Sequence, residues 1–406
     1  MGLAMHHMTG VDEKREWNLF IKFCQMAISQ HITHPKAKEV QAINWKHIQN
    51  LATVHQVRPL LFKALSKWEF RDVVPTWFME QLRRFQIQQT GRCLNHTKEL
   101  ISLIKEFHRE NVEIIPYKGV LLSKEVYGDW ASREISDIDF LMKLEDFDVI
   151  KRIMQSRRYQ PEFVIPEAFE RKFFKRNCEY NFSLFEGNHR VFHVEPHWIL
   201  GNKLYQTHLN YHDIQPFVVK QKLFGEHIQM LGPEGTLLTT CLHHGGQDRW
   251  RSLKQVSDIA AIINQFGNQI DWELFLQKSV KFRVKNIVLL GIALADEFFQ
   301  VALPNRVKQL IATPLIKEHA TQVSEQLACF DEYCEPKERN KDFFEGMKFQ
   351  LGLREHWLTK LKILFYHIQH ILVPNVYDVV GTTHFSRSTY WLLFLKKPFR
   401  LLKGKR

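Results

Sequence analysis

Strand-forming residues are confined to the middle of this 406-residue chain, and that confinement limits the folds it can adopt. Short apolar runs over residues 112–117 and 138–142 predict two strands. The runs at 179–185 and 191–195, joined by a Gly- and Asn-containing turn at 186–190, predict a β-hairpin. On both sides of this region apolar residues recur at three- and four-residue steps, which indicates amphipathic helices. We therefore expect an α+β protein with helical segments before and after the strands.

These changes of pattern suggest four segments that pack on one another. There is no internal repeat and no Pro- or Ser-rich linker that would let parts of the chain move independently. The expected segments are an N-terminal helical segment at 11–100, an α/β core at 101–231, a C-terminal helical domain at 232–352 and a basic aromatic tail at 353–406.

Composition and charge favour a cytoplasmic protein with polyanionic partners. The chain has 56 Lys and Arg against 44 Asp and Glu, a net charge of +12, which suits nucleoside triphosphates, nucleic acid or anionic lipid. The six cysteines are scattered, without the paired spacing of a zinc knuckle or redox dithiol. The N-terminus lacks the pattern of a signal peptide. The longest apolar run, residues 287–295, is shorter than a membrane span and predicts a buried helix.

Two aspartates one residue apart mark the second predicted strand. Because side chains alternate along a strand, Asp137 and Asp139 present their carboxylates on one face, while Ile138 is buried behind them. Like charges this close favour a bound cation, and hard oxygen ligands suit magnesium, or manganese in its place. An isolated Asp-x-Asp is common in loops. The apolar strand that follows and the glycine turn that precedes it make this pair a candidate metal site.

Further candidates surround the acidic pair. Lys118 and Gly119 lie at a predicted strand-to-helix turn, where a phosphate can approach the backbone. Arg133 is placed to neutralise charge on a leaving group. Glu195 ends the hairpin and offers a third carboxylate, either as a metal ligand or as the base that deprotonates an acceptor. The alternatives are solvated basic residues and a surface charge. His193 alternates onto the face of Glu195, where a lone histidine is more often a packing residue.

Three successive blocks resemble a known family. They are the segments at 117–122, 133–141 and 194–198, and helical stretches at 45–61 and 242–260 are also similar. In this order they resemble the uncharacterised nucleotidyltransferases of the polymerase-β superfamily, which occur near polysaccharide and peptide-modification genes. The resemblance extends from about residue 45 to residue 304.

The resemblance implies a polymerase-β-like mixed sheet and transfer of a nucleoside monophosphate from a triphosphate, such as ATP, to an unidentified hydroxyl or phosphate acceptor. Two features depart from the superfamily pattern: Lys118-Gly119 replaces its Gly-Ser or Gly-Gly turn, and the third carboxylate is in a Glu-Pro-His setting. The expected catalytic and metal-binding residues are Asp137, Asp139 and Glu195. The expected substrate-binding residues are Lys118, Gly119, Arg133 and Ser136.

Polar residues in the C-terminal helices have two interpretations. His243, His244 and Asp258 either face the cleft and contact base or acceptor, or they are polar groups packed between domains. We do not count them as catalytic.

The tail also has two interpretations. From Trp357 onward, aromatic and aliphatic residues alternate with basic ones such as Lys396, Lys397 and Arg400. Such a segment either lies on an anionic membrane or docks on the core and ends in a solvated basic tail.

Two rival functions are kept beside the enzyme hypothesis. One is a non-catalytic nucleotide- or RNA-binding scaffold that uses the basic surface. Paired acids argue against it, and no stable nucleic-acid complex is expected. The other is a metal-dependent phosphotransferase of a different fold, and the lack of a Walker-type Gly-rich loop argues against its P-loop version.

Overall fold

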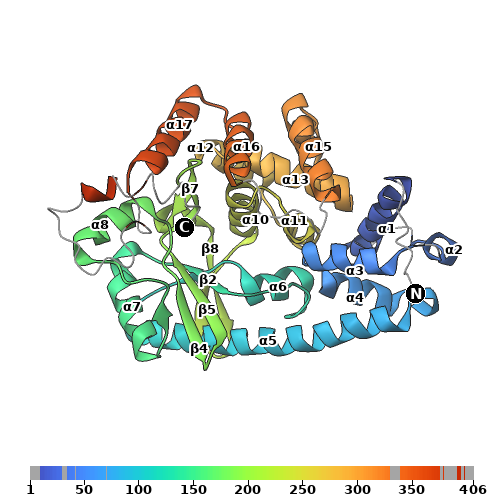
Figure 1. The fold of residues 1–406 in the computed structure, drawn as a ribbon, viewed down its shortest axis with the longest axis horizontal. Coiled ribbons are helices and arrows are strands. Elements are labelled where there is room, and N and C mark those ends of the chain that lie inside the picture. Colours follow the sequence, from blue (N-terminus) through green and yellow to red (C-terminus); the bar gives the residue numbers. More distant parts are fainter. Residues whose placement is uncertain are drawn as a thin grey trace.

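The computed structural model describes residues 10–29, 34–41, 43–69, 71–329 and 339–374, together with 378, 391–394 and 397. Helices dominate and surround one five-stranded mixed sheet, as Figure 1 shows. The expected α+β class with flanking helical segments is confirmed.

A group of short helices forms the N-terminal end of the molecule. Pro59 lies in the first turn of its helix and Pro75 caps the next long one, because proline lacks the N–H that a helix start leaves unpaired. The elements are α1 (Gly10–Ile28), α2 (Ala37–Val40), α3 (Trp45–Val54), α4 (Arg58–Lys67) and η1 (Arg71–Val73).

One long helix, α5 (Thr76–Arg109), runs along the lower edge of Figure 1 and connects this end to the sheet. Its 34 residues span about 51 Å at 1.5 Å per residue. Phe78 and Leu82 in its first part pack in the core of the short helices, whereas residues from Cys93 to Phe107 pack under the sheet. The segment boundary expected near residue 100 therefore falls inside a continuous helix.

The sheet has the strand order β1-β2-β5-β4-β3. The predicted hairpin forms as β4 and β5, and the helix expected after the turn at Lys118 and Gly119 forms as α6. The first predicted strand is much shorter than expected: only Ile115 and Pro116 pair with β2, since the chain turns at Lys118 into α6. The elements are β1 (Ile115–Pro116), α6 (Gly119–Tyr127), β2 (Ile138–Leu141), η2 (Leu144–Asp146), α7 (Phe147–Ser156), β3 (Gln160–Pro161), α8 (Glu167–Arg176), β4 (Phe182–Glu186) and β5 (His189–His197).

The pairing of β2 with β5 positions the acidic residues. These two strands are parallel, and Asp139 lies directly opposite Glu195. Phe140 follows Asp139 and Val194 precedes Glu195, so their side chains point to the opposite face of the sheet. Both are fully buried in the core against α5. The same alternation that buries the apolar face therefore places two carboxylates side by side on the opposite face.

Two small hairpins and a set of helices complete the fold. The predicted buried helix around 287–295 is confirmed as α13. The hairpin elements are β6 (Ile199–Asn202), β7 (Thr207–Asn210), α9 (Tyr211–Ile214), η3 (Gln215–Phe217), β8 (Val218–Leu223) and β9 (Glu226–Leu231). The helices are α10 (Pro233–Cys241), the π-helical η4 (Leu242–Gln247), α11 (Leu253–Phe266), α12 (Trp272–Lys281), α13 (Lys285–Phe299), α14 (Asn305–Ile311), α15 (Pro314–Ala328), α16 (Arg339–Gly352) and α17 (Trp357–Leu372).

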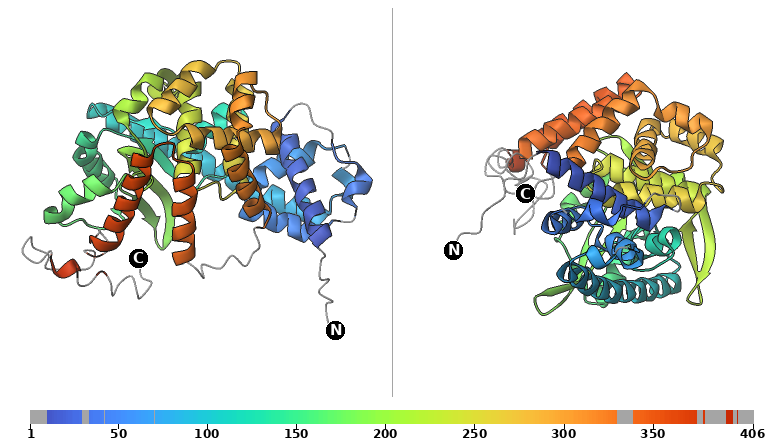
Figure 2. Two further views of the ribbon diagram at one scale, coloured as in Figure 1. Left: turned by 90° about the horizontal axis from the view of Figure 1, so that it is seen from above. Right: turned by 90° about the vertical axis from the view of Figure 1, so that its right-hand side faces the viewer.

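The N- and C-terminal helices share one hydrophobic core, although the strands separate them in sequence. The Trp17 and Phe298 rings meet edge to face at 6.3 Å, and the Gln25 side chain donates to the Phe298 carbonyl at 2.6 Å. Figure 2 shows α1 beside the helices of the C-terminal part. The two helical segments therefore form one body that packs against the sheet.

The last described helix, α17, leaves most of its apolar side chains exposed. None of the helices within the described residues combines the length and the apolar character that crossing a bilayer demands. Most of the tail after α17, including Tyr390, Lys396 and Arg400, lies outside the described residues. Lys397 is described; it is buried and donates to the carbonyls of His370 and Val373 at the end of α17.

The close contact between α13 and the Trp250 ring in the core of the helical body allows a test of the packing. A Cβ at Gly291 of α13 would lie 2.6 Å from the ring of the buried Trp250, so Gly291→Ala is expected to destabilise the fold by about 1–3 kcal/mol through overpacking. The matched change Gly91→Ala on exposed α5 meets nothing within 4 Å and should stabilise by up to about 1 kcal/mol. Chemical denaturation of both variants measures the difference. Equal stabilisation by both would show that the ring is not packed this closely.

Candidate functional site

A cluster of three potential metal ligands lies on the two central strands. Asp139 comes from β2, and Glu195 and His197 come from β5; their ligand atoms all lie within 4.8 Å of one another. His197 Nε2 is 3.4 Å from Asp139 Oδ1 and 3.6 Å from Glu195 Oε2. The parallel pairing of β2 with β5 thus brings potential ligands from two distant sequence segments close together.

Asp139 is the most unusual member of this cluster. Its side chain is 1% exposed, yet neither carboxylate oxygen accepts a hydrogen bond from the described residues. Lys118 Nζ lies 2.8 Å from Oδ1, an ion pair outside hydrogen-bond geometry. A buried carboxylate needs a cation close by, and Lys118 is that cation in this structure. Two carboxylates and an imidazole whose ligand atoms lie this close together are also a donor set that fits a divalent metal ion.

The other predicted residues border the same point. Asp137 is half-buried at the start of β2 and accepts a hydrogen bond from the exposed Ser136 hydroxyl at 3.2 Å. Gly119 begins α6 with a φ of +66°, a conformation that glycine adopts without strain. A Cβ there would lie 3.5 Å from the Asp137 carbonyl, so the α6 turn packs close to the start of β2.

A small pocket of about 70 Å³ unites these groups with the C-terminal helices. One wall of this pocket comes from residues 118–139 near the sheet, and the other comes from residues 243–255 of the C-terminal helices. Residues more than 100 positions apart in sequence therefore face each other across it. Its lining residues are Lys118, Arg133, Glu134, Ser136, Asp137, Asp139, His243, His244, Asp248, Lys254 and Gln255.

Arg133 lines the pocket, and its guanidinium is bound by the buried carboxylate of Asp258. Its Nε lies 3.0 Å from each oxygen of Asp258, and both side chains are almost completely buried. Asp258 also accepts from the Tyr127 hydroxyl at 2.9 Å and lies 2.9 Å from His244 Nε2. Arg133 is therefore not a solvated surface residue; it joins the segment before β2 to α11. Its predicted contact with a triphosphate stays a prediction.

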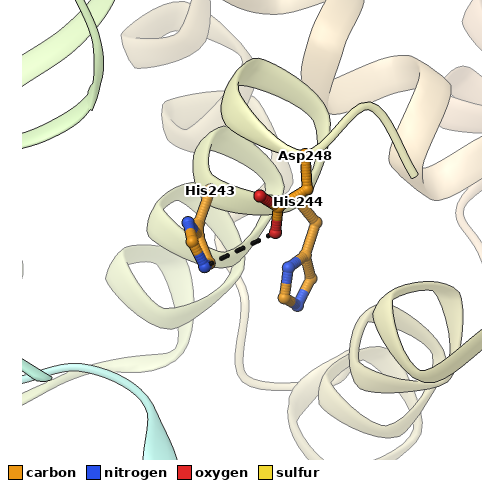
Figure 3. Close-up of side chains that lie close together, drawn as sticks. All are labelled: His243, His244 and Asp248. Atoms are coloured by element: carbon orange, nitrogen blue, oxygen red, sulfur yellow. Dashed lines mark ion pairs between the residues drawn. The ribbon is translucent and has the colours of Figure 1, made fainter. Parts of the chain in front are cut away.

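The two histidines of η4 reach the pocket. His243 Nε2 lies 2.9 Å from Lys118 Nζ, and His243 Nδ1 lies 3.3 Å from Gln247 Oε1. Figure 3 shows Asp248 beside both rings, with His243 Nε2 3.6 Å from its Oδ2. His243 and His244 therefore line the pocket, whereas Asp258 does not and supports His244 from outside it. The predicted contact of the histidines with base or acceptor stays a prediction.

The charges of the carboxylate cluster depend on its histidines. Burial opposes the charged form of His197, but the surrounding carboxylates, Glu179 first among them, raise its pKa to about 9. Burial alone would raise the pKa of Glu195, yet the imidazoles of His193 and His197, whose Nε2 atoms lie 3.1 Å and 3.6 Å from its oxygens, hold it well below its ordinary range. A carboxyl with so low a pKa is a weak base, so the site favours Glu195 as a metal ligand.

Sequence analysis missed His197, which belongs to the carboxylate cluster, and Glu179, which pairs with His197. His197 Nδ1 lies 3.0 Å from Glu179 Oε2, and its Nε2 faces Asp139. The alternation that placed His193 on the face of Glu195 also places His197 there, so this residue could have been found. Glu179 precedes β4 and meets His197 through an isolated bridge, which no local pattern reveals.

A larger cavity of about 340 Å³ adjoins the site between α8, the β6–β7 hairpin and α17. Glu179 and Gln247 are in its wall, and each contacts a histidine of the clusters described above. The other lining residues are Phe169, Lys172, Arg176, Asn177, Cys178, Gly201, Asn202, Lys203, Leu204, Tyr366, Gln369, His370 and Val373.

The buried Asp258 network predicts a pH-dependent loss of stability. Burial would raise the pKa of Asp258, but Arg133 and His244 hold it well below its ordinary value of about 3.9. Asp258→Asn leaves Arg133 buried without its counter-charge and should destabilise the protein by about 3–5 kcal/mol at pH 7. The stabilisation is fully present above the unfolded pKa and is lost as pH falls through the folded pKa, so the difference should shrink in acid.

Denaturation of the Asp258→Asn variant at several pH values measures this effect. Asp72→Asn is the matched control, because the Asp72 side chain is 96% exposed and should change stability by less than about 0.5 kcal/mol. A difference that stays constant down to acid pH would contradict the assigned charge.

The family of this chain follows from comparison with known proteins. No curated protein and no solved structure matches the chain. A family model described as uncharacterised nucleotidyltransferase matches residues 41–300, which is well over half of the chain and includes the whole sheet, the pocket and η4. The chain therefore belongs to this family of uncharacterised nucleotidyltransferases.

Proposed function

We propose that the protein is a metal-dependent nucleotidyltransferase of the polymerase-β superfamily. An acceptor oxygen forms a bond to the α-phosphorus of a nucleoside triphosphate, and the bond from that phosphorus to pyrophosphate breaks. The observation that carries this proposal is the buried carboxylate of Asp139, which lies opposite Glu195 in the sheet and whose ligand atom is within 4.8 Å of those of Glu195 and His197.

Asp137, Asp139 and Glu195 are the proposed ligands of magnesium, or of manganese in its place. When bound, such an ion neutralises phosphate oxygens and orients them for in-line displacement. His197 supports these ligands from behind, because Glu179 holds its Nδ1 while its Nε2 faces Asp139 and Glu195. The proposed ligands come from both central strands, so the sheet register fixes their separation.

The turn between β1 and α6 is the proposed phosphate contact. Lys118 caps α6, and the N–H groups of the first turn of a helix attract anions. Lys118 also carries a positive charge that burial opposes but that Asp139 and Asp137 maintain, which raises its pKa. Ser136 is exposed and lines the pocket, whereas Gly119 does not line it but packs close to the Asp137 carbonyl beside it.

The adjoining cavity of about 340 Å³ is the proposed site of the acceptor. It lies within the size range of small-molecule sites, whereas the pocket of about 70 Å³ does not. Its walls carry amide side chains such as Asn202 and Gln369 and the exposed Lys172, which suit a hydroxyl- or phosphate-bearing acceptor. Glu179 connects this cavity to the carboxylate cluster through His197.

Removal of the central ligands should abolish transfer. Incubation with each α-labelled triphosphate, magnesium and a cell extract is expected to label an acceptor. Asp139→Asn and Asp137→Asn should lower the rate by about two to three powers of ten, because several kcal/mol of charge stabilisation disappear. Asp148→Asn, on the exposed face of α7, is the matched control and should leave the rate unchanged.

Manganese binding gives a second measurement that needs no acceptor. Asp139→Asn should weaken it, with the fold intact. Label transfer that survives the double variant Asp137→Asn, Asp139→Asn would overturn the enzyme proposal. Nucleotide binding without any transfer in the parent protein would instead favour the non-catalytic scaffold.

We also propose that α17 contacts an anionic membrane surface. The helix contains no acidic residue, and Lys360 and Lys362 are exposed between its apolar side chains. Ile363 and His367 are buried against the protein, so only one side of the helix docks on the core. Exposed apolar residues with interspersed lysines are typical of interfacial helices. The exposed apolar residues are Trp357, Leu358, Leu361, Leu364, Phe365, Tyr366, Ile368, Ile371 and Leu372.

Vesicle flotation tests this contact. Replacement of Trp357, Leu361 and Phe365 by Gln should lower partition onto phosphatidylglycerol-containing vesicles by at least about tenfold, since each loses the burial of a large apolar side chain. The control carries Ile87→Gln and Leu94→Gln, which are equally exposed on α5. Equal flotation of both variants and the parent would exclude α17 as the contact.

A further inference from the structure

The π-helical segment η4 carries a second group of potential metal ligands. His243, His244 and Asp248 each offer one atom, and these atoms all lie within 4.8 Å of one another (Figure 3). We infer that these three side chains form a second metal site, distinct from the carboxylate cluster, for a divalent transition metal such as Zn²⁺ or Co²⁺.

The hydrogen bonds of His244 leave a lone pair without a partner. His244 Nε2 lies 2.9 Å from Asp258 Oδ2, so its N–H donates to that carboxylate. The other nitrogen, Nδ1, is therefore an acceptor; it is buried and has no hydrogen-bond partner among the described residues. His244 is 2% exposed, so water does not satisfy this atom freely. An imidazole held by a carboxylate on its far side is the usual arrangement of a metal-binding histidine.

The other two ligands are oriented in the same way. His243 Nδ1 lies 3.3 Å from Gln247 Oε1, which leaves Nε2 as the acceptor on the inner side. Asp248 Oδ2 accepts from Gln255 Nε2 at 2.7 Å and lies 3.6 Å from His243 Nε2. Each of the three ligands therefore has a hydrogen-bond partner outside the cluster that fixes its direction.

The π-helix explains how two consecutive histidines serve one site. In an α-helix neighbouring side chains diverge by about 100°, because a turn has 3.6 residues. The wider π turn brings them closer in direction, and such turns often mark functional sites. Close packing fixes this backbone: a Cβ at Gly245 would lie 2.8 Å from Trp250 Nε1, and Gln350 donates to the Gly245 carbonyl at 2.8 Å.

The ligand chemistry distinguishes this site from the first. Two imidazole nitrogens and one carboxylate oxygen suit zinc or cobalt, whereas a site with two or three carboxylates suits magnesium or manganese. Three protein ligands also leave coordination positions open, as in catalytic metal sites. His243, His244 and Asp248 all line the pocket, where a phosphate oxygen of the nucleotide would be the further ligand; this role rests on the proposed function.

Lys118 separates the two sites. Its Nζ lies 2.9 Å from His243 Nε2 and 2.8 Å from Asp139 Oδ1. Coordination by His243 therefore requires the ammonium to leave Nε2, and the metal competes with this lysine for one lone pair. Removal of the lysine should strengthen binding at the histidine site.

Cobalt titration of the full-length, chelator-treated protein tests the inference, because the visible absorption band of Co²⁺ reports nitrogen ligands. One Co²⁺ with such a band is expected for the parent. His243→Asn and Asp248→Asn should remove the band, and Gln247→Leu should weaken binding by about 10–100-fold through the lost support of His243. His227→Asn, an exposed histidine on β9, is the matched control and should bind as the parent does.

Two further variants separate this site from the proposed enzyme. Asp139→Asn should keep the cobalt band even if it abolishes transfer, and Lys118→Met should lower the Co²⁺ dissociation constant. Thermal denaturation verifies that each variant is folded. A band that persists in folded His243→Asn and Asp248→Asn, or a parent protein that gives no such band, would overturn the second metal site.

Discussion

One buried carboxylate, Asp258, holds the two walls of the pocket in place. It binds Arg133 from the segment before β2, the Tyr127 hydroxyl from α6 and His244 from η4. Both Asp258 and Arg133 are desolvated, so neither is stable without the other. Since Asp137 follows Arg133 closely and His243 precedes His244, this one charge pair fixes the carboxylates of the sheet relative to the histidines of the helices.

The sequence predicted those features that depend on local periodicity. Alternation along β2 placed Asp139 on a polar face and Phe140 in the core, and the turn residues near Gly187 located the β4–β5 hairpin. It could not reveal that Arg133 pairs with Asp258, 125 residues away, because no local pattern records a tertiary ion pair. The same applies to Glu179, which reaches the site only through the fold.

The core that the N- and C-terminal helices share could not be predicted from the sequence either, because it too depends on tertiary contacts. The sequence showed amphipathic helices on both sides of the strands, but each apolar face could have packed on the sheet. In the structure α1 instead packs on α11 and α13, and the His55 carbonyl accepts from the Lys254 backbone at 3.2 Å. Burial of apolar surface is not directional. The periodicity of a helix therefore shows that one of its faces is buried, but it does not show which element that face packs against. The long helix α5 then joins this helical body to the sheet.

Under the proposed function, the position of Lys118 bears on how a pocket of about 70 Å³ would take the phosphates of a nucleotide. Its ammonium lies between Asp139 and His243, where it compensates the charge of the buried carboxylate. If the carboxylates held a divalent ion, the ion would bring twice the charge to the same oxygen, and the ammonium would no longer be needed there. The long side chain of Lys118 would then be able to pair with a phosphate. One residue would thus compensate the charge of the site without substrate and the charge of the substrate when it is bound.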